Sequence, residues 1–328
     1  MNKIFKVIWS KSKQCYIVVS EMAKNHSGKK KIVVASILAA MAVGADMSAS
    51  VHAVDEGTAK PGGIALGSGS FAGSDGSIAL GKKSYAVGTQ RDGTTDPSIA
   101  IGQRAVAIGN SSLAVGLDTD IRNSYAVAVG RYATVNGDYG IGMGFKSVAT
   151  EHATAVGESA RSKKMGAAAY GVSARGYSQG GVAIGIQSLA GANTFNADGT
   201  PKTFIWNDDE TTISSYQKFG DVSIGLRTMA TGGNATALGR SAAATEANSI
   251  AIGGGDGNAL DDNKERTKAS AEKAAAIGYS ALASGKSASA LGTKASASAE
   301  NATAIGTGAA ASGAKAPAPV DNRYSRKG

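Results

Sequence analysis

The stretch SIALGKKSYAVG, residues 77–88, holds two short apolar phrases, each closed by a glycine. Alternate residues of an extended chain point to opposite sides, so Ile78 and Leu80 share one side while Ser77 and Ala79 share the other. A period of two, with glycine every few residues, is typical of short strands joined by tight turns. The same pattern is a poor fit to a helix, because glycine weakens helices.

The first phrase recurs along the chain, and its closing glycine serves as a marker for each repeat. Most successive markers are 14 residues apart, one step is 13, and the longer steps contain insertions. A weaker half-phrase lies between markers, as in residues 103–109, so each repeat predicts two short strands and two turns. A unit this small cannot bury its own apolar side, which predicts a stacked, parallel solenoid. The marker residues are Gly67, Gly81, Gly102, Gly116, Gly130, Gly144, Gly157, Gly171, Gly185, Gly225, Gly239, Gly253, Gly278, Gly292 and Gly306.

The two sides of the phrase differ in size, and we predict that the bulky, branched side forms the core of each chain. The repeat-core residues expected on this basis are Ile64, Leu66, Ile78, Leu80, Ile99, Ile101, Val127, Val129, Val182, Ile184, Ile250, Ile252 and Ile277. The small side would let another chain approach closely, so we predict that it forms a trimer contact. The expected trimer face consists of Ala65, Ala79, Ala100, Ala183 and Ala251.

Composition supports a thin repeat structure. The 328 residues include 45 glycines and only 5% aromatic residues, too few large side chains to fill a thick globular core. The regular apolar positions argue against disorder. The net charge is +9, but residues 1–53 contribute 8 lysines against 2 acidic residues, which leaves +3 for the remainder. We therefore expect no nucleic-acid partner.

The N-terminal segment has the features of a secretory signal. Three lysines at 29–31 precede an apolar run over 32–45, and small residues follow up to Ala53. We predict a signal region over 1–53 with cleavage after Ala53. A membrane anchor is the alternative, but the run is short for spanning a bilayer. The only cysteine, Cys15, lies in this region, so the exported chain carries no disulfide.

The repeat and the leader together resemble a known family. Ser-Ile-Ala-Ile-Gly at 98–102 and 249–253 resembles the head repeats of trimeric autotransporter adhesins, the YadA-like group, and residues 1–24 resemble that family's extended signal region. The resemblance implies an all-β, left-handed parallel β-roll of about 14-residue repeats that forms a homotrimer on a Gram-negative cell surface. It also implies binding to a host extracellular matrix protein, collagen-like or other, or to a cell-surface receptor.

Family members normally continue into a coiled-coil stalk and a C-terminal membrane barrel. We see no sustained heptads and no membrane strands after Gly313. We therefore expect a head without its own membrane anchor, which is a fragment, a truncated gene product or a released form. The expected location is the outer membrane surface, or outside the cell if the chain is complete as given.

The expected organisation is a short leader over 54–61, the head over 62–313 and a Pro/Ala linker over 314–328. Insertions are predicted at 89–97, 192–219 and 254–273. The insertion at 192–219 contains Phe204, Trp206 and Tyr216 and reads as a hairpin. These aromatic residues are candidate ligand contacts. The alternative is that they pack back on the roll or on a neighbouring chain.

Catalysis finds no support in the residue inventory. His152 is the only histidine after Ala53, so Ser–His–Asp and zinc chemistry both lack partners. Residues 280–287 come near a phosphate-binding loop but lack its first glycine and its strand-to-helix setting. We predict no enzyme activity, no cofactor and no metal site. The expected function is a non-enzymatic adhesin head, and the alternative is a structural spacer or a self-associating module for autoagglutination and biofilm.

Overall fold

The computed structural model describes residues 5–10, 15–20, 57–91, 94–191, 220–255 and 265–313. The chain divides into two compact units, Met1–Met47 and Ser48–Gly328. In the first unit, β1 (Phe5–Ser10) and β2 (Cys15–Ser20) form an antiparallel pair.

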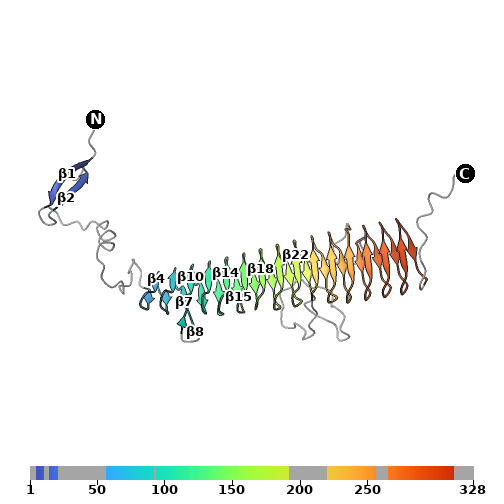
Figure 1. Cartoon of the computed structure of the whole chain (residues 1–328), viewed down its shortest axis with the longest axis horizontal. Helices are drawn as coiled ribbons and strands as arrows, with labels where there is room; N and C mark the ends of the chain where they lie inside the picture. The colour runs from blue at the N-terminus through green and yellow to red at the C-terminus, as the bar shows by residue number, and fades with distance from the viewer. Residues whose placement is uncertain are drawn as a thin grey trace. The chain divides into compact units, whose positions relative to one another are not determined.

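The second unit is a parallel β-solenoid, whose coils follow one another in Figure 1 from blue-green to red. Each coil gives one strand to each of two sheets. The fifteen-stranded sheet consists of β4 (Ile64–Leu66), β6 (Ile78–Leu80), β10 (Ile99–Ile101), β12 (Leu113–Val115), β14 (Val127–Val129), β16 (Ile141–Met143), β18 (Thr154–Val156), β20 (Ala168–Tyr170), β22 (Val182–Ile184), β24 (Val222–Ile224), β26 (Thr236–Leu238), β28 (Ile250–Ile252), β30 (Ala275–Ile277), β32 (Ser289–Leu291) and β34 (Thr303–Ile305).

The half-phrases build the other sheet. This sixteen-stranded sheet consists of β3 (Thr58–Ala59), β5 (Phe71–Ala72), β7 (Tyr85–Val87), β11 (Val106–Ile108), β13 (Asp120–Ile121), β15 (Thr134–Val135), β17 (Val148–Ala149), β19 (Arg161–Ser162), β21 (Arg175–Gly176), β23 (Leu189–Ala190), β25 (Met229–Ala230), β27 (Ala243–Ala244), β29 (Lys268–Ala269), β31 (Leu282–Ala283), β33 (Ser296–Ala297) and β35 (Ala310–Ala311).

The register aligns equivalent residues of successive repeats. Ala100, for example, lies opposite Ala79 of one neighbouring coil and Ala114 of the other. Among the described residues the structure contains strands and turns and no helix. The predicted all-β class and the parallel stacking of repeats about 14 residues long are therefore confirmed.

The marker glycines form a ladder along one edge, in what we call the first turn, which leads from the fifteen-stranded to the sixteen-stranded sheet. All fifteen have positive φ angles, between 113° and 149°. A Cβ atom on Gly116 would lie 2.6 Å from the carbonyl oxygen of Gly130 in the next coil. Every marker that has a following marker shows a clash of this kind. Backbone conformation and close approach of neighbouring coils therefore both require glycine here.

The second turn leads back to the fifteen-stranded sheet, and it has its own left-handed position two residues before each strand except β10, where Pro97 stands. That position is held by Tyr139 at φ 58° and by Asn234 at φ 51°, as well as by glycines. A left-handed residue with a side chain costs roughly 1 kcal/mol. Hydrogen bonds between coils hold these turns, as when the Tyr139 amide donates to the Ser124 carbonyl at 3.1 Å.

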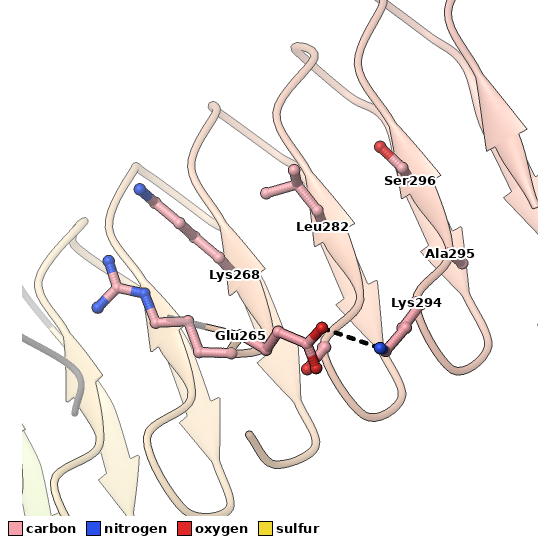
Figure 2. Close-up of a pocket in the computed structure, with 8 residues that line it drawn as sticks. Glu265, Lys268, Leu282, Lys294, Ala295 and Ser296 are labelled. Atoms are coloured by element: carbon pink, nitrogen blue, oxygen red, sulfur yellow. Dashed lines mark hydrogen bonds and ion pairs between the residues drawn. The ribbon is translucent and has the colours of Figure 1, made fainter. Parts of the chain in front are cut away.

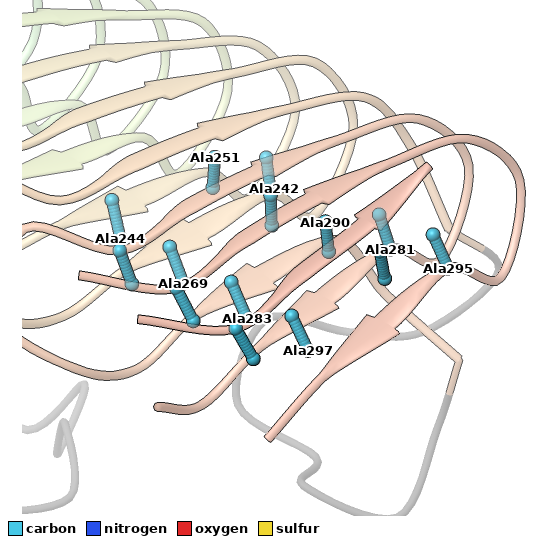
Figure 3. Packing of buried hydrophobic residues seen from close by; sticks show 14 of the residues in the cluster. Ala242, Ala244, Ala251, Ala269, Ala281, Ala283, Ala290, Ala295 and Ala297 are labelled. Atoms are coloured by element: carbon cyan, nitrogen blue, oxygen red, sulfur yellow. The ribbon is translucent and has the colours of Figure 1, made fainter. Parts of the chain in front are cut away.

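The core between the two sheets is made of alanine (Figure 3). Ala251, Ala276 and Ala290 are each fully buried, and alanines of the other sheet lie in the same cluster. Val135 is a larger residue that points inward, and a glycine makes room for it. A Cβ atom on Gly140 would lie 2.5 Å from Cγ1 of the buried Val135.

The predicted assignment of the two sides of the phrase is wrong, because the structure reverses them. The predicted trimer-face residues lie inside the roll, where Ala79, Ala100, Ala183 and Ala251 are fully buried and Ala65 is 9% exposed. None of the predicted core residues is buried. The flattened coil brings its two sheets close together, so most of the side chains that fit between them are small. The residues that therefore lie on the outer face are Ile64, Leu66, Ile78, Leu80, Ile99, Ile101, Val127, Val129, Val182, Ile184, Ile250, Ile252 and Ile277.

The predicted boundaries shift at two places. β3 pairs with β5, so the roll already includes residues of the expected leader over 54–61. β29 pairs with β27 and β31, so residues from Lys268 onward belong to the roll and not to the insertion expected over 254–273. The insertion expected at 89–97 contains an antiparallel pair, β8 (Gln90–Arg91) and β9 (Thr94–Thr95).

The insertion expected at 192–219 lies outside the described residues, as do Ala53 and residues 314–328. The roll nevertheless keeps its register across that insertion. Val182 of β22 lies opposite Val222 of β24, and the Gly191 amide donates to the Ala230 carbonyl at 2.7 Å.

Candidate functional site

The outer surface of the fifteen-stranded sheet, which we call the apolar face, is the most extensive candidate site. The third residue of every strand in this sheet points outward and is apolar. Several are well exposed, from Leu291 at 37% to Ile305 at 49%. Exposed apolar ladders of this length mark an interaction surface. The row consists of Leu66, Leu80, Ile101, Val115, Val129, Met143, Val156, Tyr170, Ile184, Ile224, Leu238, Ile252, Ile277, Leu291 and Ile305.

The first residue of each strand forms a second row on the apolar face, and this row changes along the roll. It is large and apolar from Ile64 to Ile141, whereas the last three strands begin with Ala275, Ser289 and Thr303. The apolar face therefore has two apolar rows in its N-terminal coils and one in its C-terminal coils.

The outer surface of the sixteen-stranded sheet, the mixed face, has a different character. Its strands present aromatic residues near the N-terminal end, where Phe71 and Tyr85 stack with ring centroids 4.9 Å apart. Further along, Asp120, Arg161 and Lys268 occupy equivalent outward positions. A surface of this composition suits solvent or a polar partner better than a buried contact between chains.

A shallow hollow lies on the mixed face near its C-terminal end (Figure 2). Lys294 Nζ lies 2.8 Å from Glu265 Oε1, and Arg266 and Lys268 also line the hollow, so basic residues outnumber acidic ones there. Lys268 and Leu282 line the same hollow from neighbouring strands. It brings together no nucleophile and base pair that would support catalysis.

Ion pairs join the turns of neighbouring coils. Arg104 forms two hydrogen bonds with Asp118, one coil further on, and these lower the pKa of the Asp118 carboxyl group and raise that of Arg104. In the other turn, Lys286 Nζ lies 2.9 Å from Glu272 Oε2, and this contact, helped by Lys273, lowers the pKa of Glu272. Because the folded carboxyl pKa values are lowered, any stability from these exposed pairs is present above the ordinary carboxyl pKa and is lost in acid.

The remaining predicted site residues, Phe204, Trp206 and Tyr216, lie outside the described residues. Within the described ranges no group of three or more metal-ligating side chains comes together. The described part of the chain also contains no helix of the length and hydropathy needed to cross a membrane.

Comparison with known families agrees with this geometry. The family model for the extended signal peptide of type V secretion systems matches residues 1–49. The model for the YadA head domain repeat matches six overlapping or separate segments, at 60–84, 96–119, 230–255, 269–295, 283–309 and 297–316. A comparison with curated proteins finds no match.

The fold defines a parallel β-solenoid with an alanine core and an exposed apolar ladder. With an extended signal peptide ahead of YadA head repeats, the chain carries the signature of trimeric autotransporter adhesins. An adhesin-type role and export toward the surface of a Gram-negative cell follow at the level of the family.

Proposed function

We propose that the exported chain is a non-enzymatic adhesin head that attaches the bacterium to host extracellular matrix or to host cells. The YadA head repeats, which the family comparison finds along the roll, carry this proposal. The described surface offers long exposed rows instead of a deep pocket. Many weak contacts, repeated along the roll and multiplied by self-association, would give adhesion through avidity.

We further propose that the apolar face is where copies of the chain associate, three together as the family leads us to expect. The reason is physical: two apolar rows in the N-terminal coils are exposed in the single chain, and burying apolar surface yields about 25 cal/mol per Å². The mixed face, with its charged residues, would then stay accessible to host ligands.

Two lysines on the apolar face should dissociate the assembly. The variant Val115→Lys/Val129→Lys places charges at equivalent positions of two neighbouring strands on the apolar face. Association of the chains would have to bury these charges, at a high cost in free energy. Sedimentation equilibrium at micromolar concentration should show trimer for the unmodified exported chain and monomer for this variant.

The matched control carries the same change on the mixed face. Thr134→Lys/Val148→Lys also alters outward residues at equivalent positions of two neighbouring strands, and this variant should remain trimeric. A monomeric unmodified chain, or equal dissociation of both variants, would show that the apolar face is not the contact.

The adhesive role is tested with beads coated with the exported chain. Layers of collagen, fibronectin or laminin and cultured host cells should each be compared with albumin-coated wells, and retention above albumin on at least one surface is expected. Beads that clump with one another but bind none of these surfaces would instead support the second candidate, a self-associating module for autoagglutination and biofilm.

Deleting residues 193–218 separates the aromatic insertion from the repeats. Because β22 and β24 pair in register across the insertion, we expect the deleted chain to keep its β spectrum and its melting temperature. Loss of bead retention with the fold intact would place the ligand contacts in the insertion, where Phe204, Trp206 and Tyr216 are the candidate residues. Unchanged retention would place them on the roll, and unfolding of the variant would mean that the insertion is a structural brace.

A further inference from the structure

The first turns carry a row of residues along one edge of the roll, one residue from each coil, directly after each marker glycine. Three consecutive coils place Val172, Ile186 and Leu226 in this row, and these residues are 43%, 52% and 40% exposed. We call them the first-turn patch. Elsewhere the row is polar, as at Lys82 and Thr293, or holds isolated apolar residues.

Backbone hydrogen bonds between coils fix the order of this row around the patch. Each row residue from Glu158 to Leu226 accepts, through its carbonyl oxygen, a hydrogen bond of 2.8–2.9 Å from an amide of the next coil. The row therefore continues without a break across the two coils that flank the insertion at 192–219. Neighbouring coils are ~4.8 Å apart, so the five residues from Glu158 to Arg240 span ~19 Å.

A charged residue stands at each end of the patch, and the two charges have opposite signs. Glu158 precedes Val172 in the row, and Arg240 follows Leu226. Both charged residues are exposed, and in the described part of the chain neither forms an ion pair. The row thus reads as an acid, three apolar residues and a base, with Ile186 at its centre.

This order is complementary to itself when a second copy of the chain lies antiparallel. A two-fold axis that passes by Ile186, perpendicular to the roll, would place Ile186 of one copy against Ile186 of the other. It would place Val172 of each copy against Leu226 of the other. It would also place Glu158 of each copy against Arg240 of the other, so that an ion pair closes each end of an apolar centre.

The same residues disfavour a parallel contact. With both rolls pointing the same way, Glu158 would face Glu158 and Arg240 would face Arg240, and like charges across an interface oppose association. The antiparallel arrangement also continues without conflict beyond the ion pairs. There Phe145, which is 39% exposed, would face Gly254, which has no side chain.

We propose that the first-turn patch, with Glu158 and Arg240 at its ends, is a contact between antiparallel copies of this chain on different cells. Heads exported by one cell point the same way, whereas heads of two cells that meet point toward each other. An antiparallel contact therefore joins cells. This inference rests on the self-association given above as the second candidate function, to which it assigns a surface, and it does not require binding to a host.

The contact is small, and a single one is weak. Three apolar side chains from each copy bury far less area than the roughly 1,200–2,000 Å² of a stable interface. Many heads between two cells would add their contacts and raise the effective affinity by avidity. The test therefore has to trap a transient contact between chains in solution.

Single cysteines can trap it, because the only cysteine of the chain, Cys15, lies in the signal region. Under mild oxidation the exported Ile186→Cys chain is expected to form a disulfide-linked dimer. Val172→Cys and Leu226→Cys should each link poorly alone, since the two cysteines would be ~10 Å apart along the roll. This distance exceeds the ~7 Å between Cα atoms that a disulfide can bridge. A mixture of these two variants should link readily.

Charge reversal tests the ends of the contact. Adding Glu158→Arg to the Ile186→Cys chain should abolish the dimer, because arginines would then face one another at both ends. Adding Arg240→Glu as well should restore it, because the ion pairs form again in the opposite sense. Thr307→Cys is the matched control for chance collisions, since it occupies the same row in a C-terminal coil.

Repeating the cross-linking in the Val115→Lys/Val129→Lys chain separates this contact from association through the apolar face. The dimer should persist in that chain. The proposal is overturned if the dimer disappears there, if Ile186→Cys links no faster than Thr307→Cys, or if Val172→Cys alone links as well as the mixture. Absence of any effect of charge reversal would overturn it too. Sedimentation of the unmodified chain and the bead assay report on the proposed function separately, so the two failures can be told apart.

Discussion

Replacing Ala290 by leucine is expected to destabilise the C-terminal coils by about 3 kcal/mol. Ala290 is fully buried, and its sheet neighbours Ala276 and Ala304 are fully buried alanines as well (Figure 3). Leucine adds three carbon atoms in a space that holds only methyl groups. Each coil contacts only its neighbours, so the displaced sheets cannot redistribute the strain over a larger core.

The measurement is thermal unfolding of the exported chain followed by far-UV circular dichroism. Ser289→Leu is the matched control, because it introduces the same side chain one residue earlier on the outer face of the same strand. The control should melt near the unmodified chain, while Ala290→Leu melts earlier or loses its final coils to proteolysis. Equal melting of the two variants would contradict an alanine-filled core.

Gly116→Ala is expected to destabilise the roll by a comparable amount, on the order of 3 kcal/mol, from backbone strain and steric overlap together. Its φ angle of 138° lies where residues with a side chain are rarely found, and the added methyl would lie 2.6 Å from the Gly130 carbonyl oxygen. Relief of this steric overlap would require the neighbouring coils to separate. Their separation would weaken the hydrogen bond from the Gly130 amide to the Val115 carbonyl.

Gly308→Ala is the control for glycine replacement as such. Its φ angle is 66°, a Cβ atom there would meet nothing within 4 Å, and the equivalent position one coil earlier holds Lys294 in a similar conformation. We expect a loss of about 1 kcal/mol or less. Chemical denaturation of both variants measures the difference, and a Gly116→Ala loss no larger than that of the control would show that the ladder tolerates side chains.

The period of the repeat and the role of glycine were predictable from the sequence, because both depend on local chemistry. Which side of the phrase faces inward was not, since a period of two defines two faces without ranking them. A signal was nevertheless available in the half-phrase. Ala105 and Ala107 are small there as well, whereas the outward neighbour varies from Val106 to Asp120 to Arg161 in equivalent strands. A position that is small in most repeats points to a narrow interior, and a position that varies between apolar and charged residues points to solvent or to a partner.

The stacking of Tyr125, Tyr139 and His152 on successive second turns could not be predicted by spacing, because these residues are separated by steps of 14 and 13 residues. A missing residue would normally move every later side chain to the opposite face of its strand. The structure absorbs the deletion in the second turn, where four residues separate β17 from β18 and five separate β15 from β16. His152 therefore stays aligned with Tyr139, and only the strand register of the structure reveals this alignment.

The parallel ladder also determines how the head would respond to mechanical load. Neighbouring coils are joined by hydrogen bonds between strands and by a single covalent strand of chain, so tension applied between the two ends of the roll would peel coils away one at a time. A released coil of 14 residues extends to about 46–50 Å, compared with the ~4.8 Å it occupied in the stack, a gain of roughly 40 Å per event. Under the adhesive role proposed above, a head loaded by flowing liquid would lengthen in steps and dissipate force before its attachment breaks.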